Sequence, residues 1–267
     1  MKTPKYLIPD LFMADPAAHV FNGRLYIYPS HDVESGIPEN DNGDHFDMRD
    51  YHVYSTDDIE NGVLTDHGVV LDVPSIPWSG RQLWDSDAAF KNGKYYIYFS
   101  LKDRNDVFHI GVAVSDKPEG PFVAEDAPIK GSYSIDPCVF REDDDAHYIY
   151  FGGLWGGQLQ RYRANKAIEC GHEPADNEPA LCPKVAKLSE NMLEFAEEPR
   201  DLVILDENGE PLKAGDHDRR FFEASWMHKY NGKYYFSYST GNTHYLCYAI
   251  GDNPYGPFTY QGIILTP

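Results

Sequence analysis

The sequence predicts an all-β fold of the β-propeller type, and two repeated patterns carry that prediction. In the first pattern, a head residue precedes a short apolar strand, a tight turn and a tyrosine-rich strand. This pattern occurs four times, at residues 15–28, 85–98, 136–150 and 223–236. In the second pattern, at residues 112–122 and 248–258, a strand ends in an Asp-containing turn followed by Gly-Pro. Repeated units of about four strands are typical of propeller blades.

Each copy of the first pattern is predicted to form a β-hairpin. Asn-Gly occupies the turn in three copies, beginning at Asn22, Asn92 and Asn231, and a run of aspartates at 143–145 occupies it in the other. Asn-Gly between alternating apolar and polar residues is a strong signal of a tight hairpin. The second pattern supplies further strands, and its Gly-Pro pair blocks continued ladder pairing.

The units follow one another without a linker long enough to separate domains. We expect a single propeller domain over residues 1–267, with blades at about 15–70, 84–122, 134–187 and 221–264. Two polar excursions, residues 31–50 and 164–220, interrupt the blades. Such excursions on a repeat scaffold commonly lie on one rim and shape a binding site. Within the second excursion, residues 187–195 are expected to form a short helix.

Composition excludes several classes of partner. The formal charge of −20 disfavours binding to nucleic acid and to anionic membranes, and no stretch has the roughly 20 apolar residues of a membrane span. The N-terminus lacks the apolar core of a secretory signal, so we expect a cytoplasmic protein, or a secreted one if a signal was removed. The scattered cysteines are expected to be reduced, with a Cys170–Cys182 disulfide as the alternative.

Three acids stand at the heads of the repeated strands, namely Asp15, Asp136 and Glu223. Equivalent strands of a propeller converge on one channel, where like charge and burial raise the pKa of carboxyl groups. Such a site can hold one protonated and one ionised carboxyl group, as hydrolysis of a glycosidic bond requires. For Asp15 and Asp136 the alternative is a carboxylate that caps a turn. Glu223 lies in an apolar aromatic run, where an unpaired Glu is costly.

The strand heads together resemble glycoside hydrolase family 43. The matching segments are Ala14-Asp15-Pro16, Trp84-Asp85-Ser86-Asp87, Ser134-Ile135-Asp136-Pro137 and Phe222-Glu223-Ala224-Ser225. The resemblance covers nearly the whole chain. It implies a five-bladed β-propeller and the inverting hydrolysis of arabinose- or xylose-containing oligo- and polysaccharides, as by α-L-arabinofuranosidases and β-xylosidases.

The same resemblance implies a role for each head acid. Asp15 would be the general base that activates water, and Glu223 the general acid that protonates the leaving oxygen. Asp136 would raise the pKa of Glu223 and hold it in place. Inversion requires the base and the acid to stand roughly 6.5 to 9.5 Å apart, because water must fit between the base and the sugar.

We expect the family's fifth blade to be missing after the fourth repeated unit, since Pro267 follows soon after Phe258. We therefore expect about four blades, and an open blade edge through which the chain could self-associate. A catalytically impaired, carbohydrate-binding propeller fragment is the alternative function. A structural scaffold for a protein partner is a second alternative.

Five further residues are candidates for binding the sugar. Trp84 and Trp155 could stack on a sugar ring, and glycines beside Trp155 could let the backbone approach a ligand. Gln158 could hydrogen-bond a hydroxyl group. Asp85 aligns with the head acid of blade one and Asp87 lies beside it, so one of this pair is expected to face the sugar. Backbone capping is the alternative for both.

No motif predicts a required cofactor or a metal ligand. The acid-rich runs at 41–50 and 142–145 lack the spacing of a calcium loop, so a structural Ca²⁺ is an unsupported alternative. No Cys/His set has zinc spacing, and no glycine motif indicates nucleotide binding. Lone histidines such as His19, His31 and His244 are expected to be satisfied surface or core residues.

Overall fold

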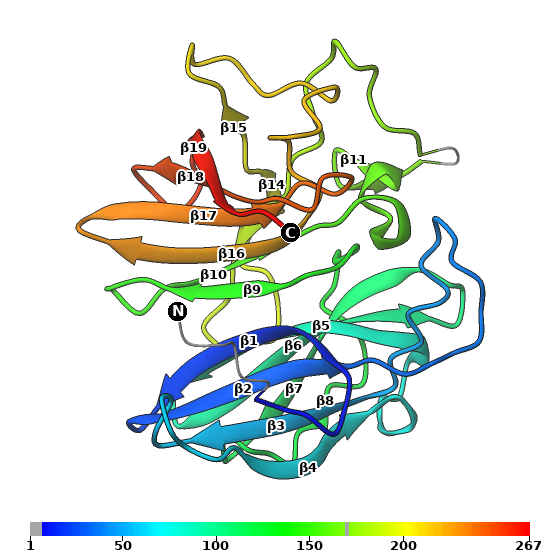
Figure 1. The fold of residues 1–267 in the computed structure, drawn as a ribbon, viewed down its shortest axis with the longest axis vertical. Coiled ribbons are helices and arrows are strands. Elements are labelled where there is room, and N and C mark those ends of the chain that lie inside the picture. Colours follow the sequence, from blue (N-terminus) through cyan, green and yellow to red (C-terminus); the bar gives the residue numbers. More distant parts are fainter. Residues whose placement is uncertain (1–6, 169–170) are drawn as a thin grey trace.

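The computed structural model describes residues 7–168 and 171–267, which form four blade sheets of mainly antiparallel strands (Figure 1). Residues of all four blades line a hollow. The prediction of an all-β propeller with about four blades is confirmed. Cys170 lies outside the described residues, so the alternative disulfide with Cys182 stays a prediction.

Blades one and two each contain four consecutive strands paired in chain order. Blade one consists of β1 (Met13–Phe21), β2 (Arg24–His31), β3 (Asp50–Thr56) and β4 (Thr65–Asp72). Blade two consists of β5 (Ser79–Lys91), β6 (Lys94–Asp103), β7 (Phe108–Ser115) and β8 (Val123–Ala124). A single 3₁₀ turn, η1 (Val73–Ser75), connects the two blades.

Blades three and four are built less regularly. Blade three consists of β9 (Cys138–Arg141), β10 (His147–Phe151), β13 (Lys184–Lys187) and β14 (Arg200–Asp201). Blade four consists of β16 (Glu223–Tyr230), β17 (Lys233–Ser239), β18 (Leu246–Gly251) and β19 (Phe258–Leu265), with β15 (Ile204–Leu205) added parallel to β19. Between β10 and β13 lie η2 (Trp155–Gly157), η3 (Leu159–Arg161) and the small hairpin of β11 (Tyr162–Arg163) and β12 (Lys166–Ala167).

The predicted Asn-Gly hairpins are confirmed by their backbone angles. Asn22 and Gly23 have φ values of 54° and 79°, and the pairs beginning at Asn92 and Asn231 have φ values of 53° and 77° and of 48° and 74°. Positive φ at both central residues defines the type I′ turn, whose twist matches that of the flanking strands. In blade three, Asp145 takes the left-handed conformation instead, with φ 67°.

The long excursion 164–220 differs from its prediction in two ways. Its segments β13 and β14 complete blade three, which therefore extends to Asp201 rather than to Lys187. The helix expected at residues 187–195 is wrong. Leu188 instead forms an isolated antiparallel bridge with Phe195, and the amide of Ser189 donates to the carbonyl of Glu194 at 2.9 Å. Side-chain bonds of the intervening Ser and Asn residues favour this turn over helix.

Tyrosines at one repeat position join neighbouring blades. The last residue of the first pattern in blades one, two and three is a buried tyrosine whose hydroxyl donates to a backbone carbonyl of the next blade. These bonds join Tyr28 to Pro118, Tyr98 to Met192 and Tyr150 to Pro254, at 2.7, 2.9 and 2.9 Å. The equivalent residue of blade four is Phe236, which packs in the core. Buried tyrosines commonly combine such packing with one hydrogen bond.

The edge of blade four is partly covered. Strand β15 pairs with β19 at Phe258 and Thr259, and Ile263, Ile264 and Leu265 farther along β19 remain exposed. Self-association through this edge stays a prediction. Among the described residues, no helix is long and apolar enough to cross a membrane.

Candidate active site

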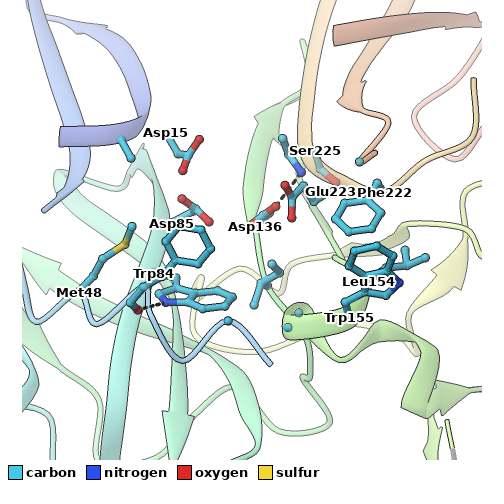
Figure 2. Close-up of a pocket in the computed structure, with 18 of the residues that line it drawn as sticks. Asp15, Met48, Trp84, Asp85, Asp136, Leu154, Trp155, Phe222, Glu223 and Ser225 are labelled. Carbon is cyan, nitrogen blue, oxygen red and sulfur yellow. Dashed lines mark hydrogen bonds between the residues drawn. The ribbon is translucent and has the colours of Figure 1, made fainter. Parts of the chain in front are cut away.

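The hollow is a cavity of about 850 Å³ lined by residues of all four blades. Four acids enter it: Asp15 from blade one, Asp85 from blade two, Asp136 at the start of blade three and Glu223 from blade four (Figure 2). Apolar side chains border them, namely Phe46, Met48, Trp84, Leu154, Trp155 and Phe222. An acidic centre with aromatic walls suits a ligand with hydroxyl groups and flat apolar faces.

Irregular backbone at the strand heads brings the acids into the hollow. The pairing register shifts in β1 around Asp15, in β5 around Asp85 and in β16 just after Glu223. Asp15 and Asp136 have φ values of 44° and 57°, and Ala224, next to Glu223, has φ 61°. Non-glycine residues rarely adopt this left-handed conformation, and bulges redirect side chains at sites. The convergence of the three predicted acids is thereby observed.

Burial and mutual repulsion raise the pKa of all four acids. Burial is the largest cause for Glu223, whose pKa rises to about 8, and the charges of Asp85 and Asp15 add to it. Burial likewise raises the pKa of Asp136 to about 7 and holds that of Asp85 well above its usual range. For Asp15, whose pKa rises to about 8, the charge of Asp85 is the largest cause. Because the charge on one acid changes the pKa of its neighbours, the four carboxyl groups titrate together rather than independently.

Asp136 is tied to the backbone that carries Glu223. Its Oδ2 accepts a hydrogen bond of 2.6 Å from the amide of Ala224, and its own amide donates to Ser100 Oγ at 3.0 Å. Figure 2 shows the carboxyl groups of Asp136 and Glu223 side by side. Among the described residues, Oδ1 of Asp136 and Oδ1 of Asp85 are buried without a hydrogen-bond partner.

The adjacent acids Asp85 and Asp87 have different environments. Asp87 lines the hollow, but its carboxylate accepts bonds from His19 Nε2 at 2.5 Å, from the amide of Ala88 at 2.8 Å and from the amide of Val139 at 2.6 Å. Asp87 therefore fits the capping alternative. Asp85, grouped by sequence with the sugar-binding residues, lies among the acids of the hollow.

Trp84 and Trp155 both line the hollow, as their prediction as sugar-binding residues requires. Trp84 is buried, and its Nε1 donates to the carbonyl of Phe46 at 2.7 Å. Trp155 is 38% exposed and meets Phe222 edge to face, with ring centroids 5.2 Å apart. A direct contact with sugar stays a prediction for both.

The prediction for Gln158 is wrong. Its side chain is buried away from the hollow, with Oε1 accepting from the amide of Phe108 at 3.0 Å and Nε2 donating to the carbonyl of Asp106 at 2.9 Å. With both ends of the amide used, Gln158 joins blade two to the η2–η3 segment. The glycines near Trp155 also serve packing, since a Cβ on Gly153 or Gly157 would clash with a side chain of the core.

The loop of residues 31–50, here named the pocket loop, forms part of the site in a way that the sequence did not predict in detail. It contributes Phe46 and Met48 to the wall of the hollow. Gly43 of this loop, with φ 69°, lies against Trp84 so closely that a Cβ would stand 2.5 Å from the ring. The carbonyl of Gly43 also accepts a bond of 2.7 Å from Gln82 Nε2. Such contacts between distant segments have no signal in a single sequence.

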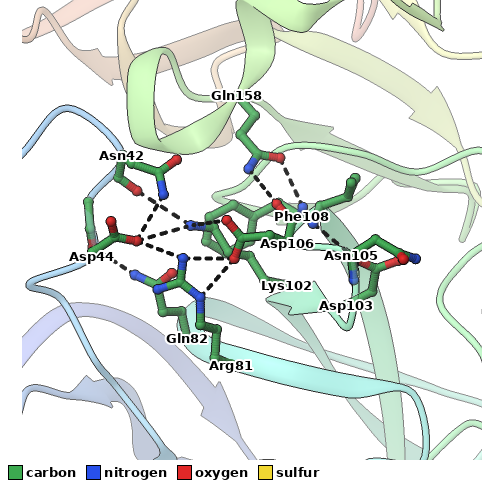
Figure 3. A network of polar contacts seen from close by, with 12 residues as sticks. Asn42, Asp44, Arg81, Gln82, Lys102, Asp103, Asn105, Asp106, Phe108 and Gln158 are labelled. Carbon is green, nitrogen blue, oxygen red and sulfur yellow. Dashed lines mark hydrogen bonds and ion pairs between the residues drawn. The ribbon is translucent and has the colours of Figure 1, made fainter.

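A paired-charge network, defined by Asp44, Arg81, Lys102 and Asp106, holds the tip of the pocket loop on blade two (Figure 3). Arg81 donates to Asp44 at 2.6 Å and to Asp106 at 2.7 Å. The bond from Arg81 is the largest cause that lowers the pKa of Asp44. Lys102 is fully buried, which lowers its pKa to about 8, and its Nζ donates to the carbonyl of Asn42 at 3.4 Å.

Comparisons with known proteins agree with this geometry. Residues 8–179 match the model of glycosyl hydrolases family 43. Over 268 residues the chain is 72% identical to a xylosidase/arabinosidase of Bacteroides ovatus, in an alignment covering 100% of this chain and 82% of that protein.

Two solved structures extend the likeness to the fold. RS223-β-xylosidase is similar with a TM-score of 0.98 at 73% identity, covering 100% of this chain and 83% of that one. CoXyl43, a β-xylosidase/α-arabinofuranosidase from a compost metagenome, was solved with xylotriose in a calcium-free form; its TM-score is 0.96 at 60% identity, covering 98% and 81% of the two chains. With this match over most of its length, and with an acid from every blade in one hollow, the chain belongs to glycosyl hydrolases family 43.

Proposed function

We propose that this protein hydrolyses xylose- or arabinose-containing oligosaccharides, as the names of its relatives say of them. The observation that carries the proposal is the meeting of Asp15, Asp85, Asp136 and Glu223 in one partly enclosed hollow, with raised pKa values. A site of this kind holds a protonated and an ionised carboxyl group at the same pH, which cleavage of a glycosidic bond requires.

Glu223 is the general acid in this proposal. With a pKa of about 8 it is largely protonated at neutral pH, and it gives its proton to the glycosidic oxygen as the bond to the anomeric carbon breaks. Asp136 positions it, because the bond from the amide of Ala224 to Asp136 fixes the backbone next to Glu223.

Asp15 is the general base, and Asp85 controls its charge. The charge of Asp85 is the largest cause of the raised pKa of Asp15, so a proton on Asp85 removes that cause and lets Asp15 ionise. Asp15 then accepts a proton from the water whose oxygen attacks the anomeric carbon. Attack from the face opposite the leaving group inverts the configuration, and solvent afterwards returns a proton to Glu223 and takes one from Asp15.

The walls of the hollow orient the sugar. Trp84 and Met48 stand on one side, and Trp155 and Phe222 on the other (Figure 2). Phe46 meets the ring of Trp84 edge to face. Pentose rings carry few substituents, so their faces pack well against aromatic side chains. These contacts hold the anomeric carbon between the base and the acid. The sugar is then already positioned for reaction, so less entropy is lost on reaching the transition state.

Calcium fits the donor set of the hollow. Ca²⁺ takes oxygen ligands, and the unpartnered Oδ1 atoms of Asp85 and Asp136 are buried carboxylate oxygens. When bound, the ion would supply positive charge that keeps carboxylates ionised. The acid and base roles above belong to the chain's own residues.

The acid role is tested by Glu223→Gln with leaving groups of different quality. We expect xylobiose hydrolysis to fall by about 10²–10⁴-fold, and release of dinitrophenol from dinitrophenyl β-xyloside to fall far less, because a good leaving group needs no proton. Glu60→Gln, the same change at an exposed turn, is the matched control. Equal losses on both substrates would remove Glu223 from the acid role.

Inversion is tested separately by NMR of the first sugar released. We expect α-xylose from a β-xyloside before mutarotation, and β-xylose as first product would contradict the mechanism. A wild-type chain that binds xylotriose but releases no xylose would instead favour the carbohydrate-binding alternative.

A further inference from the structure

Two histidines and a carboxylate converge where the pocket loop leaves and rejoins blade one. His31 is the last residue of β2, Asp50 is the first residue of β3, and His52 follows two positions later. One ligand atom from each lies within 4.8 Å of the others. All three side chains are half-buried, so an ion could reach them from solvent. His31 was expected to be a satisfied surface or core residue, because it stands alone in the sequence. The fold brings it to Asp50 and His52 across a long loop.

The spacing of the three side chains suits a single small cation. His31 Nδ1 lies 2.8 Å, and His52 Nε2 lies 3.9 Å, from Asp50 Oδ1. Ligand atoms at the Zn–N and Zn–O distances of a tetrahedral zinc site stand about 3.3 Å apart, between these two values. Small side-chain rotations would therefore bring the three atoms into one coordination shell.

A fourth residue holds His52 in the orientation that a metal requires. His52 Nδ1 lies 3.0 and 3.2 Å from the two carboxylate oxygens of Asp66. This contact places the ring proton on Nδ1 and leaves the lone pair of Nε2 directed toward Asp50. A carboxylate behind a histidine is the usual second shell of a metal-binding imidazole.

The donor types select the class of ion. Two imidazole nitrogens with one carboxylate oxygen match Zn²⁺ and related divalent transition metals, with water completing the shell. Ca²⁺ and Mg²⁺ prefer oxygen donors throughout. A plain hydrogen bond between His31 and Asp50 is the competing interpretation, and it requires neither His52 nor Asp66.

We propose that His31, Asp50 and His52 bind a divalent transition-metal ion of the zinc class, which clasps the base of the pocket loop. The two ends of that loop, His31 and Asp50, are both ligands, so the ion cross-links them. The paired-charge network already holds the tip of the loop. A loop held at its tip and at its base keeps its wall of the hollow in place.

The binding test uses Co²⁺, a spectroscopic substitute for Zn²⁺, titrated into the whole chain. We expect one saturable ion with visible d–d bands, displaced by Zn²⁺. Asp66→Asn should weaken binding by about 10–100-fold, as loss of second-shell support does. His52→Ala and His31→Ala should weaken it at least as much, and circular dichroism would confirm that both variants fold.

His109→Ala is the matched control, because His109 Nε2 also faces a carboxylate, that of Asp103 at 3.6 Å. We expect this variant to bind Co²⁺ like the wild type. Wild-type protein without a saturable Co²⁺ signal would overturn the proposal. So would binding that survives both His31→Ala and His52→Ala, which would place the ion elsewhere.

The clasp is tested by proteolysis of the pocket loop with a glutamate-specific protease, which can cut after Glu34 and Glu39. Zn²⁺ should slow cleavage of the wild-type chain at these sites and leave the rate for His52→Ala unchanged. If the two proteins respond to Zn²⁺ alike, the ion does not hold the loop and this part of the proposal is wrong.

Discussion

Charged side chains are arranged in opposite ways in the hollow and in the paired-charge network beside it. In the hollow, four carboxyl groups face one another, and among the lining residues that the structure describes none is a lysine or an arginine. In the network, Asp44 and Asp106 each contact Arg81, and Lys102 lies within 4.0 Å of both. The pKa of the hollow's acids is raised, whereas Arg81 lowers the pKa of Asp44.

The difference separates chemistry from support. Like charges without partners cost folding free energy, and under the proposed function they hold protons that the reaction uses. Paired charges hold no such protons, but they fix the loop that forms one wall of the hollow. Replacing an acid of the hollow should therefore change turnover, and replacing a residue of the paired-charge network should change stability.

The largest effect is expected for Asp15→Asn. Loss of the proposed general base should lower kcat by about 10²–10⁴-fold. The melting temperature should not fall, because the change removes a charge that repels Asp85. Kinetics on nitrophenyl xyloside and thermal unfolding measure the two quantities.

Asp44→Asn is the matched control for that change, because it makes the same substitution in the network. We expect a lower melting temperature and a much smaller loss of kcat. If Asp15→Asn loses stability while Asp44→Asn keeps it, the contrast between the clusters is wrong.

The second-largest effect is expected for Arg81→Met, which should lower the free energy of unfolding. The substitution removes the hydrogen bonds from Arg81 to Asp44 and Asp106 and leaves Lys102 as their only cation in the network. Loss of such charged hydrogen bonds costs about 1–3 kcal/mol of unfolding free energy. The lower part of this range applies here, because Arg81 is partly exposed. KM should rise because the pocket loop loses its anchor. Urea denaturation and steady-state kinetics give both values.

Arg104→Met provides the control for Arg81→Met. Arg104 is an exposed arginine in the turn that follows Lys102, and it donates to the carbonyl of Pro77. Surface substitutions of this kind stay within about 0.5 kcal/mol. Equal losses of unfolding free energy in the two variants would show that the paired-charge network stabilises the fold no more than an exposed arginine does.

Local patterns in the sequence were sufficient for the blades and for the acids. Asn-Gly turns and strand heads repeat at similar spacing, so the sequence alone predicts that Asp15, Asp136 and Glu223 head equivalent strands. Their roles need the geometry and the kinetics proposed above. Asp85 was found by alignment with Asp15, but only the fold distinguishes it from Asp87, which caps backbone amides.

Contacts between distant segments could not be predicted from the sequence. Gln158 looked like a sugar ligand because it follows a glycine-rich turn, and it proved to join two parts of the scaffold. The pairing of Asp44 with Arg81 depends on how the pocket loop folds over blade two. The last strand of blade three, β14, lay beyond the predicted boundary because an irregular segment separates it from its partner β13.

Gly43→Ala should have a smaller effect, on the contact between the loop and Trp84. A Cβ at Gly43 would stand 2.5 Å from the Trp84 ring, so the loop must move. We expect a loss of about 1–3 kcal/mol, as for overpacking, and a higher KM. Urea denaturation and kinetics measure these effects.

Gly36→Ala separates the steric effect from backbone strain. Gly36 has φ 70°, close to the 69° of Gly43, but a Cβ there would meet nothing within 4 Å. Strain alone should cost about 1 kcal/mol and leave KM unchanged. If the two alanine variants behave alike, contact with Trp84 does not position the loop.

The smallest effect is expected for Asp85→Asn, and it depends on pH. The acids of the hollow have folded-state pKa values raised to about 7 or 8, well above their unfolded values. Such groups bind more protons when folded, so their stabilising contribution is complete below about pH 4 and is lost as the pH rises through 7 to 8.

Asp85→Asn removes one charge from this set, so the variant should lose less stability than the wild type between pH 5 and pH 8. At pH 8 it should melt about 2–4 °C higher, which corresponds to about 1 kcal/mol. Asp87→Asn, two positions along the same strand, should instead lower the melting temperature at both pH values, because Asp87 accepts bonds from Ala88 and Val139. Parallel pH profiles for wild type and Asp85→Asn would mean that Asp85 does not govern the protons of the hollow. Opposite shifts of the melting temperature in Asp85→Asn and Asp87→Asn would instead show that hydrogen-bond partners decide whether a buried carboxyl group stabilises or destabilises this fold. Burial alone would not explain such a difference.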